Sequence, residues 1–146
     1  MPGYLQLKTI NRIFDANINR AKEGLRVCEE ITRFALNSRT LTAEFKALRH
    51  RIDRVAGKLP AGELLKERKS LEDVGRNIYS NELKRKSLAD IFYANIQRVK
   101  EAIRVLEEFA KLKNKNIALR FKAIRYDIYE IEKKAAKRIS SLSNRG

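Results

Sequence analysis

The stretch NINRAKEGLRVCEE at residues 17–30 decides the fold, because it returns 78 residues later as NIQRVKEAIRVLEE at residues 95–108. Nine of the fourteen aligned positions are identical. A second pair of segments matches at an offset of 76, FKALRHRI at residues 45–52 and FKAIRYDI at residues 121–128, with five of eight positions identical. The two motifs follow each other in the same order in both halves, so the chain is two copies of one unit.

Apolar residues in each copy recur at three- and four-residue spacing, which is the pattern of amphipathic helices. The sequence predicts helices over about residues 9–36, 40–56, 87–112 and 117–142, and a short helix over 63–69. Turns are expected at residues 37–38 and 114–116, and Ser87 with Asp90 resembles a capping box. We therefore expect an all-α fold, a helical bundle of two duplicated helical hairpins joined by a long crossover loop.

A length of 146 residues suits one helical domain, with hairpin 1 at about residues 9–56, a loop at 57–86 and hairpin 2 at about 87–142. The loop has no repeat partner and is far longer than a helical bundle needs. Loops of this length in compact domains are usually functional or disordered. The alternative is a crossover that only spans the bundle. Asp73-Val74-Gly75 suits a tight turn that presents a carboxylate, so we favour a functional loop.

The composition points to an anionic partner. The chain has 33 Lys and Arg against 18 Asp and Glu, a formal charge of +15, as expected of a protein that binds nucleic acid, an acidic membrane or a phosphorylated small molecule. One cysteine (Cys28) and one histidine (His50) exclude an internal disulfide, a Cys/His zinc site and a Ser-His-Asp triad within the chain. No apolar run is long enough to span a membrane, and without a secretory leader a cytoplasmic location is expected.

Polar residues fall on the apolar face of two predicted helices, namely Asn17 and Arg20 in the first copy and Asn95 and Arg98 in the second. An unpaired buried polar group costs about 1–3 kcal/mol, so these side chains need partners. One solution is internal pairing along the helix with Glu23 and Glu101. The other is a cleft that binds an anion through arginine forks, since guanidinium geometry matches phosphate. The net charge favours the cleft.

A further set of charges follows three- and four-residue spacing on the polar side of the same helices. It contains Glu23, Arg26 and Glu30 in the first half and Glu101, Arg104 and Glu108 in the second. From spacing alone, solvated ion pairs are the better explanation. That explanation fails if this side closes against the loop or against another subunit, and a homodimer would account for the paired charges.

The motifs also carry a family resemblance. The string DANINRAKEGLRV at residues 15–27, followed by Arg33-Phe34, Leu48-Arg49-His50, Asp73-Val74-Gly75 and the second copy at 95–108, resembles a thiamine-pathway domain. That domain lies at the N-terminus of some bacterial thiamine-phosphate synthases, and free-standing members are labelled thiamine-phosphate pyrophosphorylase-like. The resemblance covers nearly the whole chain. Gly24 and His50 differ between the halves, because their counterparts are Ala102 and Tyr126.

The resemblance implies a monofunctional hydroxymethylpyrimidine phosphate kinase of thiamine biosynthesis. Such an enzyme makes the pyrimidine pyrophosphate that the synthase condenses with thiazole phosphate, and it needs ATP as co-substrate and Mg²⁺. The synthase barrel itself is absent, because the chain lacks both the length and the alternating strands and helices.

Roles for individual residues are assigned on physical grounds, since phosphoryl transfer depends mainly on positioning and on neutralising charge. Arg20, Arg26 and Arg49 are expected to hold phosphates. Asn17 and Asn95 are expected to bind the pyrimidine or its phosphate, Asp73 or Glu23 to hold Mg²⁺, and Arg68 to close over from the loop. The catalytic candidates are thus Asp73, Arg20 and Glu23, and His50, Arg98, Glu101 and Arg104 complete the substrate-binding set. If one half carries the site, we expect it to be the first.

Two alternatives remain open. A basic nucleic-acid-binding bundle agrees with the charge, although basic and acidic residues are interleaved and no helix-turn-helix is evident. The other is a non-catalytic module that docks on thiamine-phosphate synthase.

Overall fold

The computed structural model describes residues 3–59, 61–76 and 83–143 of the chain, and in that part it is all helical, with no strand. The long helices are α1 (Tyr4–Phe34), α2 (Arg39–Ala56), α4 (Leu88–Ala110) and α5 (Lys115–Ser143). A short helix α3 (Ala61–Lys66) and a 3₁₀ turn η1 (Ser70–Glu72) lie in the connection between the hairpins. The prediction of an all-α helical bundle is therefore confirmed.

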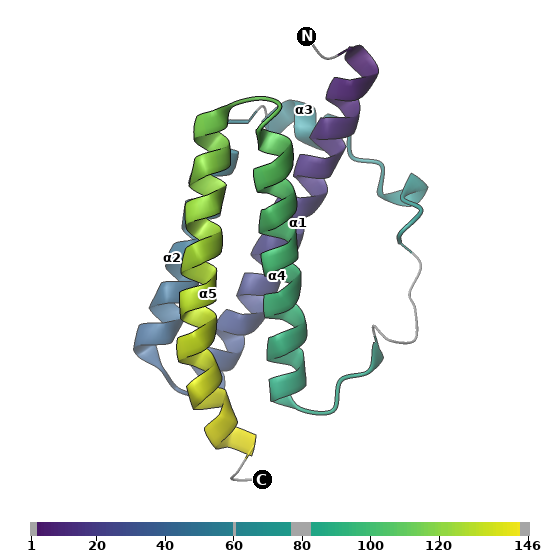
Figure 1. Ribbon diagram of the computed structural model, residues 1–146. Helices are drawn as coiled ribbons and strands as arrows, with labels where there is room; N and C mark the ends of the chain where they lie inside the picture. Colours follow the sequence, from purple (N-terminus) through teal and green to yellow (C-terminus); the bar gives the residue numbers. More distant parts are fainter. Residues whose placement is uncertain (1–2, 60, 77–82, 144–146) are drawn as a thin grey trace.

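The four long helices form an antiparallel bundle (Figure 1). Helix α1 packs on α2 and α4, and α5 packs on α4 and α2, so each helix has two neighbours around one core. The turn between α1 and α2 and the turn between α4 and α5 lie at opposite ends of the bundle (Figure 1). The duplicated hairpins are thus packed against each other head to tail.

This arrangement explains why the connection is long. Helix α2 ends at the end of the bundle opposite to where α4 begins (Figure 1), so the chain must return along the whole length of α4. The 23 residues of α4 span about 35 Å, which about ten extended residues could cover. The connection has about three times that number. Its described part uses the surplus to form α3 and η1, and α3 packs on α1.

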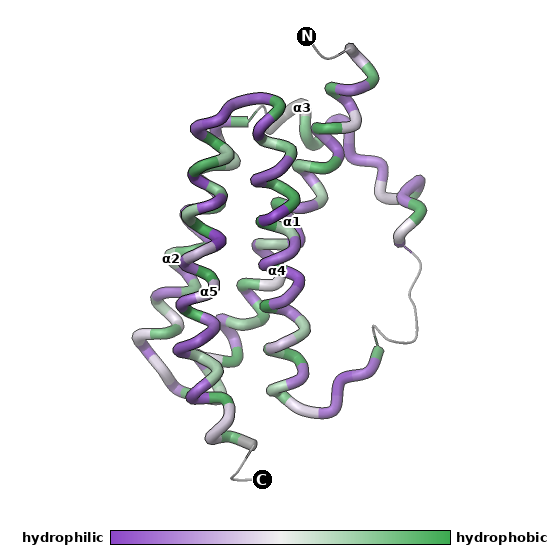
Figure 2. Tube along the Cα trace, in the orientation of Figure 1, coloured by the Kyte–Doolittle hydropathy of each residue, from purple (hydrophilic) through white to green (hydrophobic). Residues whose placement is uncertain are grey.

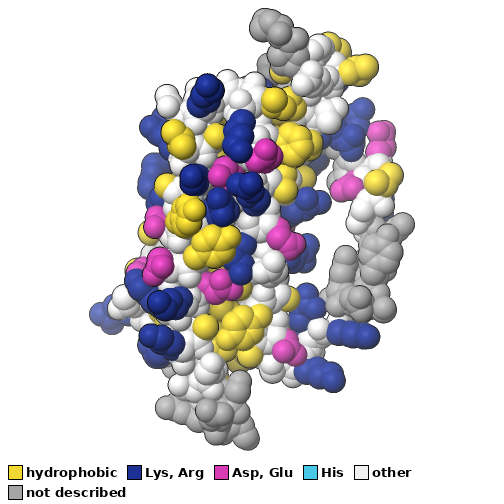
Figure 3. Space-filling model, in the orientation of Figure 1, with side chains coloured by type: hydrophobic (Ala, Val, Ile, Leu, Met, Phe, Trp, Pro, Cys, Tyr) yellow, Lys and Arg dark blue, Asp and Glu magenta, His cyan; other side chains and the backbone are white. Residues whose placement is uncertain are grey.

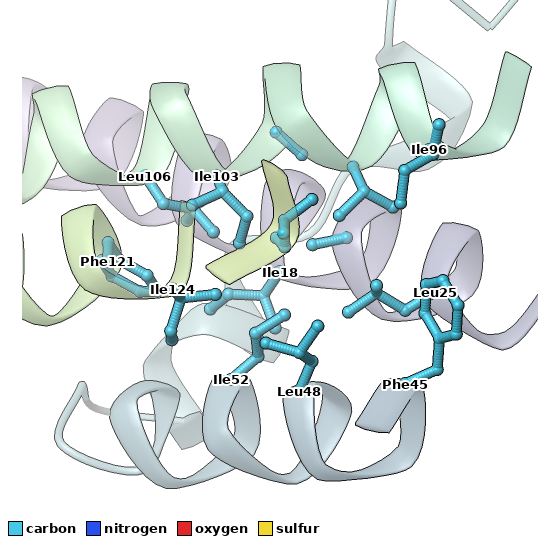
Figure 4. Close-up of a cluster of buried hydrophobic side chains, with 14 of the residues drawn as sticks. Ile18, Leu25, Phe45, Leu48, Ile52, Ile96, Ile103, Leu106, Phe121 and Ile124 are labelled. Carbon is cyan, nitrogen blue, oxygen red and sulfur yellow. The ribbon is translucent and has the colours of Figure 1, made fainter. Parts of the chain in front are cut away.

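The core is built from the apolar stripes that the sequence predicts. Hydrophobic and hydrophilic residues alternate along all four long helices (Figure 2), and the buried hydrophobic residues come from each of them. The fully buried side chains include Phe45 and Ile52 of α2, Phe121 and Ile124 of α5, and Leu25, Ile96 and Ile103 of α1 and α4. In the cluster Phe45 lies beside Leu25, and Phe121 lies at the other end (Figure 4). None of the described helices is long and apolar enough to cross a membrane.

Helix α1 begins at Tyr4 rather than at the predicted Thr9. Its first turn exposes Tyr4 and Leu5, so the periodicity of a buried stripe could not reveal it. It ends before Asn37, which has a positive φ of 50°, a conformation that asparagine tolerates better than most residues. The Ser38 hydroxyl then caps α2 by accepting from the Leu41 amide at 3.2 Å.

The other helix ends differ from prediction by a few residues. Ser87 caps α4 by accepting from the Asp90 amide at 3.1 Å, so the predicted cap is confirmed, but the Asp90 carboxylate returns to the amide of Lys86 rather than to that of Ser87. The short helix covers residues 61–66 instead of 63–69. Asn114 accepts from the Asn116 and Ile117 amides and so organises the start of α5.

Candidate functional site

A cleft of about 560 Å³ opens between α1 and the connection that follows α3. Four of the residues predicted for the site line it, although they come from distant parts of the sequence: Asn17, Arg20, Arg68 and Asp73. The other polar lining residues are Thr9, Arg12, Asp15, Asn19, Lys69 and Ser70. We call this hollow the α1 cleft. It lies on the first copy of the repeat, the half that the sequence analysis favours.

The connection is fastened to α1 by a two-point ion pair. The Arg68 Nε and NH2 atoms donate to the two Asp15 carboxylate oxygens at 2.7 and 2.6 Å. This hydrogen-bonded pairing raises the pKa of the Arg68 guanidinium, and the charge of Glu23 adds to the effect. The Asp15 side chain is only 12% exposed, so the bond closes one wall of the cleft. Arg68 therefore reaches from the connection to α1, where its partner is a protein carboxylate, and its predicted role in holding substrate stays a prediction.

The α1 cleft carries more positive charge than its own acids neutralise. Asp15 is already paired with Arg68, while Arg12 and Arg20 are exposed and have no acidic partner among the described residues. Lys69 makes only a long ion pair with Glu72, at 3.9 Å. Two guanidinium groups are thus available to an anion at the edge of the cleft, and arginine binds phosphate oxygens in bidentate fashion.

Asn17 and Asp73 supply the neutral and acidic groups of the cleft. Asn17 is buried, its Nδ2 donates to the Ile13 carbonyl at 2.9 Å, and its Oδ1 accepts from Arg20 at 3.4 Å. The Asp73 Oδ1 accepts from the Gly75 amide at 2.8 Å, which makes the tight turn that the sequence predicts. The other Asp73 oxygen has no protein donor among the described residues.

The expectation that both asparagine and arginine pairs point inward is only half right. Asn17 is buried and Asn95 half-buried, and each donates to the carbonyl four residues earlier in its own helix. Arg20 and Arg98 are exposed, so that part of the prediction is wrong. A long arginine side chain at the edge of an apolar stripe can leave it while its stem stays packed. Among the described residues neither arginine pairs with Glu23 or Glu101.

The remaining predicted residues do not line the α1 cleft. Glu23, Glu101, His50 and Arg98 are exposed on the helix surfaces. Arg26 pairs with Glu29 and Glu30, each at 3.3 Å, and Arg104 pairs with Glu107 and Glu108. Arg49 lies with Arg26 on the other side of α1. The predicted set is therefore divided between the α1 cleft and the rest of the bundle.

The sequence analysis missed the most buried charged groups. Glu29 and Glu107 are each 4% exposed, and each carboxylate is held by an arginine of the neighbouring helix. Arg49 donates to Glu29 at 2.9 and 3.2 Å, and Arg125 donates to Glu107 at 2.7 and 3.4 Å. Burial acts to raise the pKa of Glu107, but the hydrogen bonds and charges of Arg125 and Arg104 outweigh it and lower that pKa.

The sequence analysis also missed Asp15 and Arg12 as site residues. Comparing the two copies of the repeat could have found them. Their counterparts at the offset of 78 are Tyr93 and Asp90, so both positions change character between the copies. Positions that differ in this way are candidates for a function confined to one half. Asp15 stands inside the motif at residues 15–27, but on a helix face that periodicity assigns to solvent.

The lining of the α1 cleft contains two carboxylates, Asp15 and Asp73, so a magnesium ion there would need phosphate oxygens for further ligands. Among the described residues no three His, Cys, Asp or Glu side chains form a group able to hold a metal. Asp73 has one free oxygen, and magnesium in phosphate-handling sites is often held by one or two carboxylates plus substrate phosphates. Asp73 is therefore the residue that would hold the ion. Glu23 lies outside the cleft lining.

The sequence matches one family profile and several curated proteins. The ThiD2 family profile matches residues 12–134. The thiamine-phosphate synthase of Nostoc punctiforme is 41% identical over 126 residues, and that of Synechocystis sp. is 40% identical over 124 residues. The matches cover 86% and 84% of this chain but 35% of each relative, so the chain spans about a third of the length of these curated relatives. No solved structure matches.

Proposed function

The chain belongs to the ThiD2 family, and from this premise we propose that it is a domain of thiamine biosynthesis that binds a phosphorylated pyrimidine in the α1 cleft and works beside thiamine-phosphate synthase. The relatives that bear the synthase name carry this domain as about a third of a longer chain. A domain retained beside an enzyme in this way suits a role in supplying or holding that enzyme's substrate.

The observation that carries the proposal is the unneutralised pair Arg12 and Arg20 at the rim of the α1 cleft. Two guanidinium groups without acidic partners supply the charge and the fork geometry that a phosphate monoester needs. The Asp15–Arg68 ion pair keeps the opposite wall in place, so the site needs little reorganisation when a ligand enters.

The ring of the ligand has polar partners in the same cleft. Asn17 uses one hydrogen of its Nδ2 group on its own helix and keeps a second donor. Asn19, two residues further along α1, also lines the cleft and is only half-buried. Carboxamides both donate and accept hydrogen bonds, which is what an aminopyrimidine ring with its nitrogen acceptors requires.

The finer proposal is that the domain phosphorylates hydroxymethylpyrimidine phosphate to the pyrophosphate with ATP. The name of the relatives mentions a synthase and no kinase, so this activity is supported only by the sequence resemblance described above and by the residues of the α1 cleft. The presence of Asp73 among the cationic side chains favours it. A magnesium ion would screen the phosphate charges there, Arg20 would hold the transferred or accepting phosphate, and Asp15 would keep Arg68 in place over the cleft.

Two measurements test these proposals separately. Titration calorimetry with hydroxymethylpyrimidine phosphate is expected to give binding to the wild-type chain and loss of that binding in Arg20→Ala. The matched control is Arg98→Ala, the repeat counterpart on α4, which should still bind because Arg98 does not line the α1 cleft. If Arg20→Ala and Arg98→Ala bind hydroxymethylpyrimidine phosphate equally well, the proposed site is wrong.

A coupled assay of ADP release with the same pyrimidine tests the kinase step. Turnover that Asn17→Ala and Asp73→Asn abolish, with the helical circular dichroism intact, is the expected result. Binding without turnover would remove the kinase proposal and leave the non-catalytic module, which is then tested by co-purification with a thiamine-phosphate synthase.

A further inference from the structure

Two cationic hollows outside the α1 cleft are related by the internal repeat. The first hollow, of about 720 Å³, lies between α1 and α2 and includes Arg33, Asn37 and Ser38 near the hairpin turn. The second, of about 540 Å³, lies between α4 and α5 beside the turn of the other hairpin. We call them the hairpin pockets. Neither includes a residue that lines the α1 cleft.

Every cationic position of the first hairpin pocket is cationic in the second. The pairs are Arg26 with Arg104, Arg33 with Lys111, Arg39 with Lys115, Lys46 with Lys122, and Arg49 with Arg125. The two copies have diverged elsewhere, as the change from Asp15 to Tyr93 shows. Two of these pairs, Arg26 with Arg104 and Arg49 with Arg125, hold a buried glutamate in each copy. The other three pairs hold no buried acid, so their shared pattern points to a shared ligand.

Each hairpin pocket contains one carboxylate, and that carboxylate is already saturated. Glu29 is held by Arg49 and Arg26, and Glu107 by Arg125 and Arg104. The buried glutamate therefore orients two arginines. Its negative charge is already paired with them, so it does not neutralise the other cations of the pocket. In the first pocket Arg49 uses Nε and NH2 on Glu29, which leaves its NH1 group for another acceptor.

In the described part of the chain each hairpin pocket contains an equivalent pair of cations without an acidic partner, and Arg33 of the first pocket also lacks one. The equivalent pairs are Arg39 and Lys46 in the first pocket and Lys115 and Lys122 in the second. Figure 3 shows Lys and Arg side chains gathered over the upper half of α5, the part that lines the second pocket. Close like charges repel each other, and an anion bound among them removes that repulsion.

We propose that each hairpin pocket binds a condensed phosphate such as pyrophosphate, giving two equivalent phosphoanion sites per chain that are separate from the α1 cleft. The phosphate groups are what the sites recognise, because the first pocket has no aromatic lining residue on which a base could stack. Each pocket lies beside its hairpin turn, and the two turns are at opposite ends of the bundle (Figure 1). This separation favours two small anions over one continuous polyanion.

The test uses paired neutral substitutions that leave the buried carboxylates untouched. Arg39→Gln with Lys46→Gln removes two cations from the first pocket, and Lys115→Gln with Lys122→Gln does the same in the second. Lys133→Gln, an exposed position of α5 that lines neither pocket, is the matched control. Binding of pyrophosphate is measured by titration calorimetry at constant ionic strength, and circular dichroism confirms that each variant is folded.

Each double variant is expected to lose one pyrophosphate per chain or to bind it at least about tenfold more weakly, since about 1.4 kcal/mol corresponds to a factor of ten. The control should keep the wild-type number of sites. Titration with ATP separates free condensed phosphate from a nucleotide tail. Both present condensed phosphate groups, but ATP adds a base and a sugar, so tighter binding of ATP than of pyrophosphate would assign the pockets to a nucleotide.

Three outcomes would overturn the proposal. The first is an unchanged number of pyrophosphate sites in both double variants. The second is equal weakening by the control, which would indicate only the net charge of the chain. The third is a DNA duplex that binds more tightly than pyrophosphate, with a steep salt dependence that both double variants reduce, because the cations would then serve nucleic acid. Binding of the pyrimidine in the α1 cleft should be unaffected by either double variant.

Discussion

Replacing Glu107 by Gln should destabilise the bundle through the arginine that it leaves behind. The Glu107 side chain is 5% exposed and that of Arg125 is 14% exposed, so the guanidinium loses its countercharge where water cannot replace it. Removing one partner of a buried pair costs about 3–5 kcal/mol. We expect about 3 kcal/mol, because glutamine keeps one acceptor oxygen and Arg125 also bonds the Tyr129 hydroxyl.

Urea denaturation at pH 7 measures this loss, and about 3 kcal/mol lowers the midpoint by roughly 1.5 M if the slope is near 2 kcal/mol per M. Glu108→Gln is the matched control. Its carboxylate is 55% exposed although it also contacts Arg104, so its substitution should shift the midpoint much less.

The loss should also depend on pH in a defined direction. The pKa of Glu107 is lowered in the folded chain, so its stabilising contribution is complete above the unfolded value of about 4.3 and disappears as the pH falls through the folded value. The gap in free energy of unfolding between wild type and Glu107→Gln should therefore narrow below about pH 4. An equal gap at pH 7 and at pH 3, or no gap at pH 7, would refute this reasoning.

Three further predictions follow from local geometry. Gly24→Ala should destabilise the fold by about 1–3 kcal/mol in thermal unfolding, because a Cβ there would lie 2.6 Å from a methyl group of Val99 on α4; an unchanged melting temperature would contradict the close packing. Cys28 should resist iodoacetamide at pH 8 until urea is added, since burial, with a smaller effect of a nearby acid, raises its pKa to about 12, and rapid labelling of the folded chain would show that it is accessible. Arg68→Ala should speed proteolysis of the connection by releasing it from Asp15, and an unchanged cleavage rate would mean that the ion pair does not hold the segment.

The repeat explains how much of the fold could be predicted. Duplicated stripes of apolar residues define two hairpins, and the head-to-tail pairing follows because each hairpin must bury its stripe against another. The start of α1 at Tyr4 could not be predicted from apolar periodicity, because the first residues of the helix are exposed and do not form part of a buried apolar stripe.

The candidate site was predictable only where residues stood on a buried stripe or in an unusual turn. Asn17 and the Asp73 turn satisfied those criteria. Asp15 and Arg12 did not, because their position is defined by a connection that returns to α1 from more than fifty residues away in sequence. Glu29 and Arg49 lie at the edges of two adjacent stripes, so their burial depends on how closely α1 and α2 approach each other.

The most direct test of the account is a crystal structure of the chain with hydroxymethylpyrimidine phosphate bound. The account predicts the ligand in the α1 cleft, with its phosphate within hydrogen-bonding distance of Arg20 or Arg12 and its ring beside Asn17 or Asn19. Density for the ligand only in a hairpin pocket, or at any site that neither Arg20 nor Arg12 touches, would contradict it.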